Sequence, residues 1–375
     1  MHKILHVISD TNVGGAGRFL LTFLANVDKN EFDVVVVLPT GSLLKPEVDS
    51  LGIKSIEISG LADKSFGIKA VKNLSAVYKV EMPHIVHTHA AMSGRVAAKM
   101  AKIKVVHTRH SVHTRQQILE EPKYKKRFPY KHVVGAINNY LSDTIIASSP
   151  VVKMSMMETG TSQKKTVMIY NGADCLIQPS VEKKAAMRFK FGIGKDNFVC
   201  SIIARLEHVK GHRHVLKAAE MLQREDSSIK IIIAGAGTQE QALKEQAAKL
   251  GLQNVIFAGF VKEIDEVLSI THLQINASHT EATCLALLEG LSLGVPAVAS
   301  DVGGNPFVIN DGVNGVLFED GDYAALASAI LNLKNNPEEL AKLGRRGAQI
   351  FAERFDSKMM TGKIENIYRD LLETR

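Results

Sequence analysis

Two glutamates, Glu281 and Glu289, lie eight residues apart in the stretch HTEATCLALLEG of residues 279–290. The residues between them are mostly apolar and Gly294-Val295-Pro296 follows, so the pattern predicts a helix that ends before the proline. Carboxylates accept hydrogen bonds, and a pair of them suits the vicinal hydroxyl groups of a ribose or a hexose. Either glutamate alone could be a solvated helix charge, but the pair at this spacing favours a ligand rich in hydroxyl groups.

Two cations and a helix start could add an anion site. The stretch ARLEHVKG, residues 204–211, follows an expected strand and carries Arg205 and Lys210, which could hold a diphosphate through bidentate and point-charge contacts. They could equally be surface charges at a strand end. The backbone N–H groups of Thr283, Cys284 and Leu285, at the start of the expected helix, would also face a phosphate.

Glycines after the first expected strand mark another place where a phosphate could approach the backbone. Gly14 and Gly15 stand there, just before a helical pattern. A dinucleotide fingerprint needs GxGxxG, but from Gly15 the pattern continues with Gly17 and Leu20, and no acidic residue ends the second strand. Nicotinamide binding is therefore disfavoured, and phosphate contact competes with an ordinary tight turn.

Several histidines lie at expected strand ends. His87 and His89 share one strand face by their period of two; His89 is the candidate for the site, and one of the two could be a core histidine. His107, His110 and His113 are spaced by three, but a zinc site needs matching geometry and usually a fourth ligand. For His107 and His110, lining of an acceptor pocket is favoured.

A nucleophilic cysteine and a metal-binding DxD motif are both disfavoured. No base accompanies Cys284 in the sequence, so we expect a packing or backbone role. In Asp320-Gly321-Asp322, the last residue precedes the apolar-periodic segment Tyr323–Leu331 and is predicted to be a helix N-cap. We expect no metal site.

The elements that must position these residues form two series of short apolar runs, separated by helical patterns. The first series is Lys3–Ile8, Asp33–Leu38, Ile53–Ile58, Ile85–Thr88, Val105–Thr108, Thr144–Ala147 and Thr166–Ile169. The second is Phe198–Ala204, Ile229–Ala234, Val255–Ala258, Leu273–Ala277, Ala297–Ala299 and Gly315–Phe318. The pattern predicts an α/β protein with two Rossmann-like, doubly wound domains.

Turn formers at Asn171-Gly172-Ala173-Asp174 and Pro179 mark a linker between the two series, so we expect domains at 1–177 and 178–355. Ligands of open α/β sheets bind beyond the carboxyl ends of strands. Two such domains facing each other would form a cleft, and the motifs above all follow strands.

Composition restricts the class of protein. The 375 residues are 45% hydrophobic and 23% charged, which favours a globular chain over a disordered one. Three cysteines without a CxxC motif, no signal-like start and no run of about 18 apolar residues predict a cytoplasmic protein. The net charge of +7 favours an anionic partner. The segment Lys123–His132 mixes cations with aromatic rings and could lie on the inner membrane face, or simply be solvated.

The order and spacing of these motifs resemble the retaining glycosyltransferases of the GT-B fold, specifically the GT4 family with its E-x7-E motif. The resemblance covers nearly the whole chain, and it is carried by the following segments: Gly14-Gly15, Val86–His89, Tyr170–Asp174, Arg205-Leu206, Lys210-Gly211, Gly235–Gly237, Glu281–Glu289, Gly294–Pro296 and Asp311–Gly315.

The resemblance implies roles residue by residue. In this family the residue matching Glu289 binds the nucleotide ribose, and the one matching Glu281 binds hydroxyl groups of the donor sugar. Those matching Arg205 and Lys210 hold the diphosphate, and the one matching His89 sits beside the transferred sugar. The Gly14-Gly15 loop would close on the phosphates, Val261 would border the base, and the C-terminal helix, 356–375, would pack back onto the first domain.

The resemblance also implies the reaction. A hexosyl unit passes from a nucleoside-diphosphate sugar, with UDP favoured and GDP as an alternative, to a hydroxyl group of a saccharide or lipid-linked acceptor in cell-surface polysaccharide synthesis. The transferred sugar is expected to keep its anomeric configuration, and the reaction is expected to need no metal ion. A nucleotide-sugar epimerase of the same architecture and a basic nucleic-acid-binding protein are the alternatives. Where the family commonly has Glu-Gly-Phe-Gly, this chain has Glu281-Ala282-Thr283-Cys284, which leaves donor specificity open.

Overall fold

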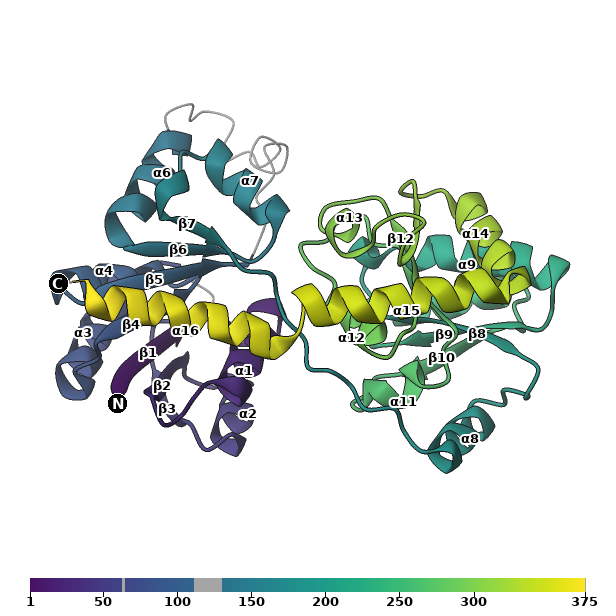
Figure 1. Ribbon diagram of the computed structural model, residues 1–375, viewed down its shortest axis with the longest axis horizontal. Coiled ribbons are helices and arrows are strands. Elements are labelled where there is room, and N and C mark those ends of the chain that lie inside the picture. Colours follow the sequence, from purple (N-terminus) through teal and green to yellow (C-terminus); the bar gives the residue numbers. More distant parts are fainter. Residues whose placement is uncertain (63–64, 111–129, 375) are drawn as a thin grey trace. The chain divides into compact units, whose positions relative to one another are not determined.

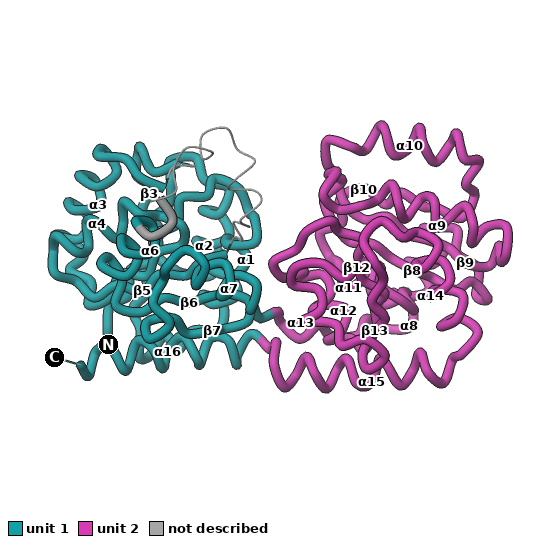
Figure 2. Tube along the Cα trace, turned by 90° about the horizontal axis from the view of Figure 1, so that it is seen from above, with its two compact units in different colours: residues 1–172, 357–375 teal, residues 173–356 magenta. Residues whose placement is uncertain are grey.

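A computed structural model describes residues 1–62, 65–110 and 130–374 of the chain (Figure 1). Two compact units divide these residues, coloured separately in Figure 2. Unit 1 comprises residues 1–172 and 357–375, and unit 2 comprises residues 173–356. The first unit therefore ends a few residues before the predicted boundary at 177/178, and the last helix of the chain belongs to it.

Unit 1 contains a parallel sheet in the order β3-β2-β1-β4-β5-β6-β7. Its strands are β1 His2–Ile8, β2 Phe32–Pro39, β3 Lys54–Ile58, β4 Ile85–His89, β5 Lys104–Arg109, β6 Thr144–Ala147 and β7 Thr166–Met168. Its helices are α1 Gly15–Asn26, α2 Lys45–Ser50, α3 Ile68–Glu81, α4 Met92–Met100, α6 Tyr130–Leu141, α7 Pro150–Glu158 and α16 Ser357–Glu373, with the 3₁₀ turn η1 Gln163–Lys165.

Unit 2 repeats this architecture with a parallel sheet in the order β10-β9-β8-β11-β12-β13. Its strands are β8 Phe198–Ile203, β9 Ile229–Ala234, β10 Val255–Gly259, β11 Leu273–Asn276, β12 Ala297–Ser300 and β13 Gly315–Phe318. Its helices are α8 Val181–Lys190, α9 His212–Glu225, α10 Glu240–Lys249, α11 Ile264–Leu268, α12 Leu285–Ser292, α13 Asn305–Val308, α14 Tyr323–Asn335 and α15 Pro337–Arg354, with the 3₁₀ turn η2 His208–Lys210.

The apolar strands lie in the middle of each unit because helices cover both faces of the sheet. In unit 1, Ile4 and Val36 pack with α1, α2 and α16 on one face, whereas Leu5 and Val35 pack with α3 and α4 on the other. Helix α16 presents one apolar stripe to this core through Met360, Ile364, Ile367 and Tyr368. The helix that follows unit 2 in the chain therefore completes the interior of unit 1.

The strand order reverses once in each sheet, and this decides where ligands can reach the backbone. In unit 1 the first strand lies between β2 and β4, and in unit 2 β8 lies between β9 and β11. Consecutive connections leave in opposite directions at these points, so a crevice opens at the carboxyl ends of the two central strands. The segments after β1 and β4, and those after β8 and β11, carry most of the predicted site residues. This confirms that the predicted motifs follow strand ends.

The Asp322 side chain caps α14. Its Oδ1 accepts a hydrogen bond of 2.8 Å from the backbone N–H of Ala325, as the sequence predicts. The cap satisfies one of the N–H groups that an α-helix leaves without an intrahelical partner.

The variant Asp322→Ala removes this hydrogen bond and should lower stability by about 1 kcal/mol. For a unit of this size, that corresponds to a fall of about 2–4 °C in the midpoint of thermal unfolding, measured by calorimetry or circular dichroism. Asp322→Asn keeps an oxygen acceptor and is the matched control, which should melt as the wild type does. Equal melting of the alanine variant would contradict the assigned cap.

Candidate functional site

An ion pair joins the segments that follow β8 and β11 in unit 2. Lys210 Nζ lies 2.5 Å from Glu281 Oε2, and the two side chains are only 17% and 12% exposed. The Ser278 hydroxyl donates to the same carboxylate oxygen at 3.3 Å. The pair brings together two of the residues predicted from the sequence, at the point where the strand order reverses.

Glycines fix the backbone that carries Glu281. A Cβ atom on Gly303 would collide with the carbonyl oxygen of Glu281, and one on Gly304 with that of Ala282. The Gly304 N–H donates to the Glu281 carbonyl at 2.8 Å. Gly211 adopts φ +66°, and a Cβ atom on it would collide with the carbonyl oxygen of Ala277. Backbone contact on two sides therefore sets the position of the glutamate, and only glycine permits that contact.

Arg205 is exposed on the loop after β8 and, within the described part of the chain, makes no ion pair. Two glycines hold this loop, because Cβ atoms on Gly235 and Gly237 would collide with the carbonyl oxygens of Ala204 and Leu206. The Gly235–Gly237 pattern thus serves packing of the loop. It leaves an available guanidinium group at the carboxyl end of a central strand.

Helix α12 begins directly after Glu281. Leu285 is its first residue and Cys284 its N-cap, without a side-chain cap, so the first N–H groups have no intrahelical partner. The Thr283 hydroxyl donates to the Ala282 carbonyl at 2.8 Å. Glu289 lies on the second turn, half-buried. The expected order of a loop glutamate, a helix start and a helix glutamate is present.

The Cys284 thiol is not activated. Burial and the Glu281 carboxylate raise its pKa to about 11, so it stays protonated near neutral pH. This agrees with the expectation that Cys284 is not a nucleophile. Val261, half-buried after β10, packs against the apolar cluster that contains Val199 and Ile232, while its neighbour Phe260 is 75% exposed. A contact of this segment with a nucleotide base remains a prediction.

Gly14 and Gly15 have no structural requirement of their own among the described residues. Gly14 is the N-cap of α1 with φ −92°, and Gly15 is the first helical residue. A Cβ atom at either position would meet nothing within 4 Å. Gly17, by contrast, packs against Leu44. Neither backbone conformation nor packing of the described residues accounts for the first two glycines.

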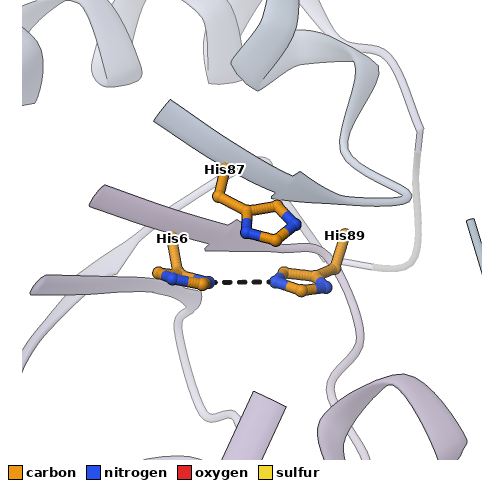
Figure 3. A group of neighbouring side chains, drawn as sticks. All are labelled: His6, His87 and His89. Carbon is orange, nitrogen blue, oxygen red and sulfur yellow. Dashed lines mark hydrogen bonds between the residues drawn. The ribbon is translucent and has the colours of Figure 1, made fainter. Parts of the chain in front are cut away.

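His89 ends β4 and is fully buried. Its Nε2 lies 3.0 Å from His6 Nδ1 and its Nδ1 lies 3.0 Å from His110 Nε2 (Figure 3). The neighbouring His87 is also fully buried and contacts Tyr368 and Thr108. Both members of the HxH pair are therefore core residues. His107 is buried as well, and its expected place along an acceptor pocket stays a prediction.

The sequence interpretation missed two residues of this cluster, His6 and Tyr368. His6 pairs in register with His87 across β1 and β4, which the spacing of two separate strands does not reveal. Tyr368 comes from α16, far along the chain. His113 and the side chains of Lys123–His132 lie outside the described residues.

Both carboxylates of the Asp320-Gly321-Asp322 segment have protein partners. Asp320 accepts from His279 Nδ1 at 2.8 Å, and Asp322 caps α14. Among the residues described, no helix combines the length and apolar character needed to cross a membrane.

Comparison with known proteins agrees with this architecture. The family Glycosyl transferases group 1 matches residues 183–350, and Glycosyltransferase Family 4 matches residues 13–175. A D-inositol 3-phosphate glycosyltransferase of Acidothermus cellulolyticus is 30% identical over 318 residues, which cover 78% of this chain and 68% of that protein. The O-antigen chain mannosyltransferase C of Escherichia coli is 30% identical over 239 residues, 62% of each chain.

Solved structures show the same fold. The crystal structure of HepE from Anabaena in complex with UDP-glucose has a TM-score of 0.83 at 22% identity, covering 99% of this chain and all of that one (100%). Two Rossmann-like units of the GT-B type and the family predicted from the motifs are thereby confirmed. The chain belongs to the group 1 glycosyltransferases.

Proposed function

We propose that this glycosyltransferase moves a hexosyl unit from a UDP-sugar, with a GDP-sugar as the alternative, to a hydroxyl group of a saccharide or lipid-linked acceptor. The observation that carries the proposal is the shielded Lys210–Glu281 ion pair beside the start of α12. The relative HepE is described in complex with UDP-glucose, and the mannosyltransferase acts in O-antigen chains, which supports the donor and acceptor classes.

Each member of the pair keeps bonding capacity for a ligand. The Lys210 ammonium has three donors, of which Glu281 takes one, so it can also contact a diphosphate. The second oxygen of Glu281, Oε1, has no hydrogen-bond partner among the described residues and can accept from a sugar hydroxyl. Glu289, on the following helix, is the proposed ribose contact. The ion pair therefore orients both groups before the donor arrives.

The chemistry follows from where charge develops. Cleavage of the sugar–phosphate bond builds negative charge on the leaving diphosphate and positive charge on the anomeric carbon. Arg205, Lys210 and the first N–H groups of α12 can stabilise the former. We infer transfer without metal because these groups already supply positive charge.

Retention of configuration is part of the proposal. Cys284, beside the pair, is a protonated thiol and a poor nucleophile, so a covalent sugar–cysteine intermediate is disfavoured. The leaving phosphate would instead assist deprotonation of the acceptor on the same face of the sugar. His89 lies at the carboxyl edge of the unit 1 sheet and Gly14-Gly15 precede α1, where phosphate could approach the backbone. A position at an anionic membrane surface, through Lys123–His132, remains a separate prediction.

The proposal predicts that UDP-sugars stabilise the native protein. UDP-glucose and related sugars, added without metal and with a chelator, should raise the melting temperature of the wild type. The rise should be much smaller in Glu289→Ala, which lacks the ribose contact, but unchanged in the control Glu245→Ala on the exposed face of α10. Equal shifts in all three proteins would exclude the ribose role. Conversion of the UDP-sugar without any acceptor would indicate an epimerase.

A second prediction concerns the ion pair. Lys210→Ala removes a contact to developing charge and should lower kcat/KM by about 10²–10³-fold. The matched control is Lys244→Ala. It removes an exposed ion pair on α10, in which Lys244 Nζ lies 2.7 Å from Glu240 Oε1, and it should leave kcat/KM unchanged. Transferase assays with the wild type at saturating acceptor provide the reference. Comparable losses in both variants would show that the effect of Lys210 is not specific.

A further inference from the structure

Arg95 of unit 1 is buried without a carboxylate partner among the residues that the structure describes. It lies in the first turn of α4 and is only 4% exposed. Its Nη1 donates to the side-chain oxygen of Asn138 on α6 at 2.6 Å, and its Nε has no hydrogen-bond partner. Asn138 is neutral and is itself buried. A guanidinium group with five N–H donors is thus buried against a single amide acceptor.

A second arginine lies on the same side of the sheet. Val105, His107 and Arg109 are two residues apart along β5, so their side chains share one face. Val105 belongs to the apolar cluster that contains Ala97 of α4, so this is the face that α4 covers. Arg109 ends β5 and is half-buried. Two guanidinium groups therefore approach each other between α4 and the carboxyl end of β5.

The surroundings of these arginines supply no negative charge within the described part of the chain. Burial lowers the pKa of Arg95 to about 10, and the Arg109 guanidinium contributes to this shift. Burial, followed by the charge of Arg95, lowers the pKa of His107 well below its usual value, so the ring stays neutral. The first turn of α4 has no acidic residue, and the positive end of its dipole adds to the charge of the guanidinium groups.

A buried cation of this kind costs stability unless something pairs with it. An apolar side chain of similar length could fill the same space, often with no loss of stability. A guanidinium group that is held in place by a neutral amide is instead suited to a carboxylate or a phosphate, which it binds through two parallel hydrogen bonds. The Nε side of Arg95, which Asn138 does not occupy, provides such a pair of donors.

We propose that Arg95 and Arg109 bind one anionic group, a phosphate or a carboxylate, and that this group belongs to the acceptor substrate. Arg109 is the more exposed of the two and makes the outer contact, whereas Arg95 makes the inner one. Asn138 is a positioning residue, because it holds Nη1 and leaves the Nε side to the anion. The assignment to the acceptor rests on the proposed function, but the anion site itself does not.

The anion site is tested by NMR of protein labelled with ¹⁵N-arginine, in which each Nε–H group gives its own signal. Glucose 1-phosphate and glucuronate each present one of the two anions on a hexose, and glucose presents neither. The signals of Arg95 and Arg109 are assigned by their loss in Arg95→Lys and Arg109→Lys. At constant ionic strength, both signals should shift to saturation with at least one anionic sugar and stay in place with glucose.

Arg369 is the internal control in the same spectra, because its Nε already donates to Glu31 Oε1 at 2.8 Å. Its signal should not move. A response to only one of the two sugars would assign the anion to phosphate or to carboxylate. The site is wrong if neither anionic sugar moves the Arg95 signal, or if Arg369 responds as strongly as Arg95 does.

Asn138→Asp tests the need for a counterion. This variant keeps the shape of the side chain and places a carboxylate on Arg95, so it should raise the melting temperature of the free protein. It should also weaken binding of the anionic sugar by about 10- to 100-fold, because the internal carboxylate competes for the guanidinium group. Unchanged affinity would overturn the role of Arg95, and if the variant fails to fold the titration of the wild type still decides.

Asn139→Asp is the matched control for the added charge. Asn139 is the next residue of α6, but its side chain donates to the Gly160 carbonyl and accepts from the Ser162 N–H, away from Arg95. This variant should leave the affinity for the anionic sugar nearly unchanged. A loss as large as that of Asn138→Asp would show that the effect is one of net charge and not of a site at Arg95.

UDP-glucose decides whether the anion belongs to the acceptor. With UDP-glucose at saturation, the anionic sugar should still shift the Arg95 signal, since donor and acceptor are bound together during transfer. If UDP-glucose itself moves this signal and blocks the anionic sugar, the anion belongs to the donor and the acceptor assignment is wrong. If the wild type does not bind UDP-glucose in a calorimetric titration, the proposed function fails, whereas a saturable shift of Arg95 still establishes the anion site.

Discussion

Reversal of strand order in a parallel sheet is the constraint on which each unit depends. Helices must cover both faces of such a sheet, so connections leave the two central strands in opposite directions. The carboxyl ends of β1 and β4 in unit 1, and of β8 and β11 in unit 2, are consequently the places where backbone stays accessible. A transferase needs backbone amides, cations and carboxylates in one place. Strand order determines where that place is, whatever side chains occupy it.

Close backbone packing then converts this place into a defined geometry. The Glu281 segment lies against Gly303-Gly304 and Gly211, and the Arg205 segment lies against Gly235 and Gly237. These contacts involve main chain rather than flexible side chains, so they hold the charged residues without filling the ligand space. The path of the chain around Ala282, Thr283 and Cys284 is therefore fixed by glycines elsewhere.

The sequence predicted the strands and their ends well, because buried parallel strands are short apolar runs bounded by turn formers. Every expected strand overlaps an observed one, and Asp322 caps its helix as predicted. The Lys210–Glu281 contact was harder to predict from the sequence. Each residue was identified separately, but their contact depends on which strands are neighbours in the sheet. The His6–His87 register and the arrival of Tyr368 from α16 depend on tertiary structure in the same way, and no local pattern encodes them.

Shielded polar groups of the chain compensate for the loss of water in two ways. Unit 2 keeps charges and pairs Lys210 with Glu281, so the cost of removing them from water is offset by attraction. In unit 1, burial lowers the pKa of His6, His89 and His110, and hydrogen bonds from ring to ring offset the loss of water. A buried network is stabilising only when its members are satisfied. Among the described residues, His110 Nδ1 has no hydrogen-bond partner, and His110 follows β5 at the carboxyl edge of the sheet, as Arg205 follows β8 in unit 2. In both units the unmet bonding capacity thus lies at the edge where the fold admits a ligand.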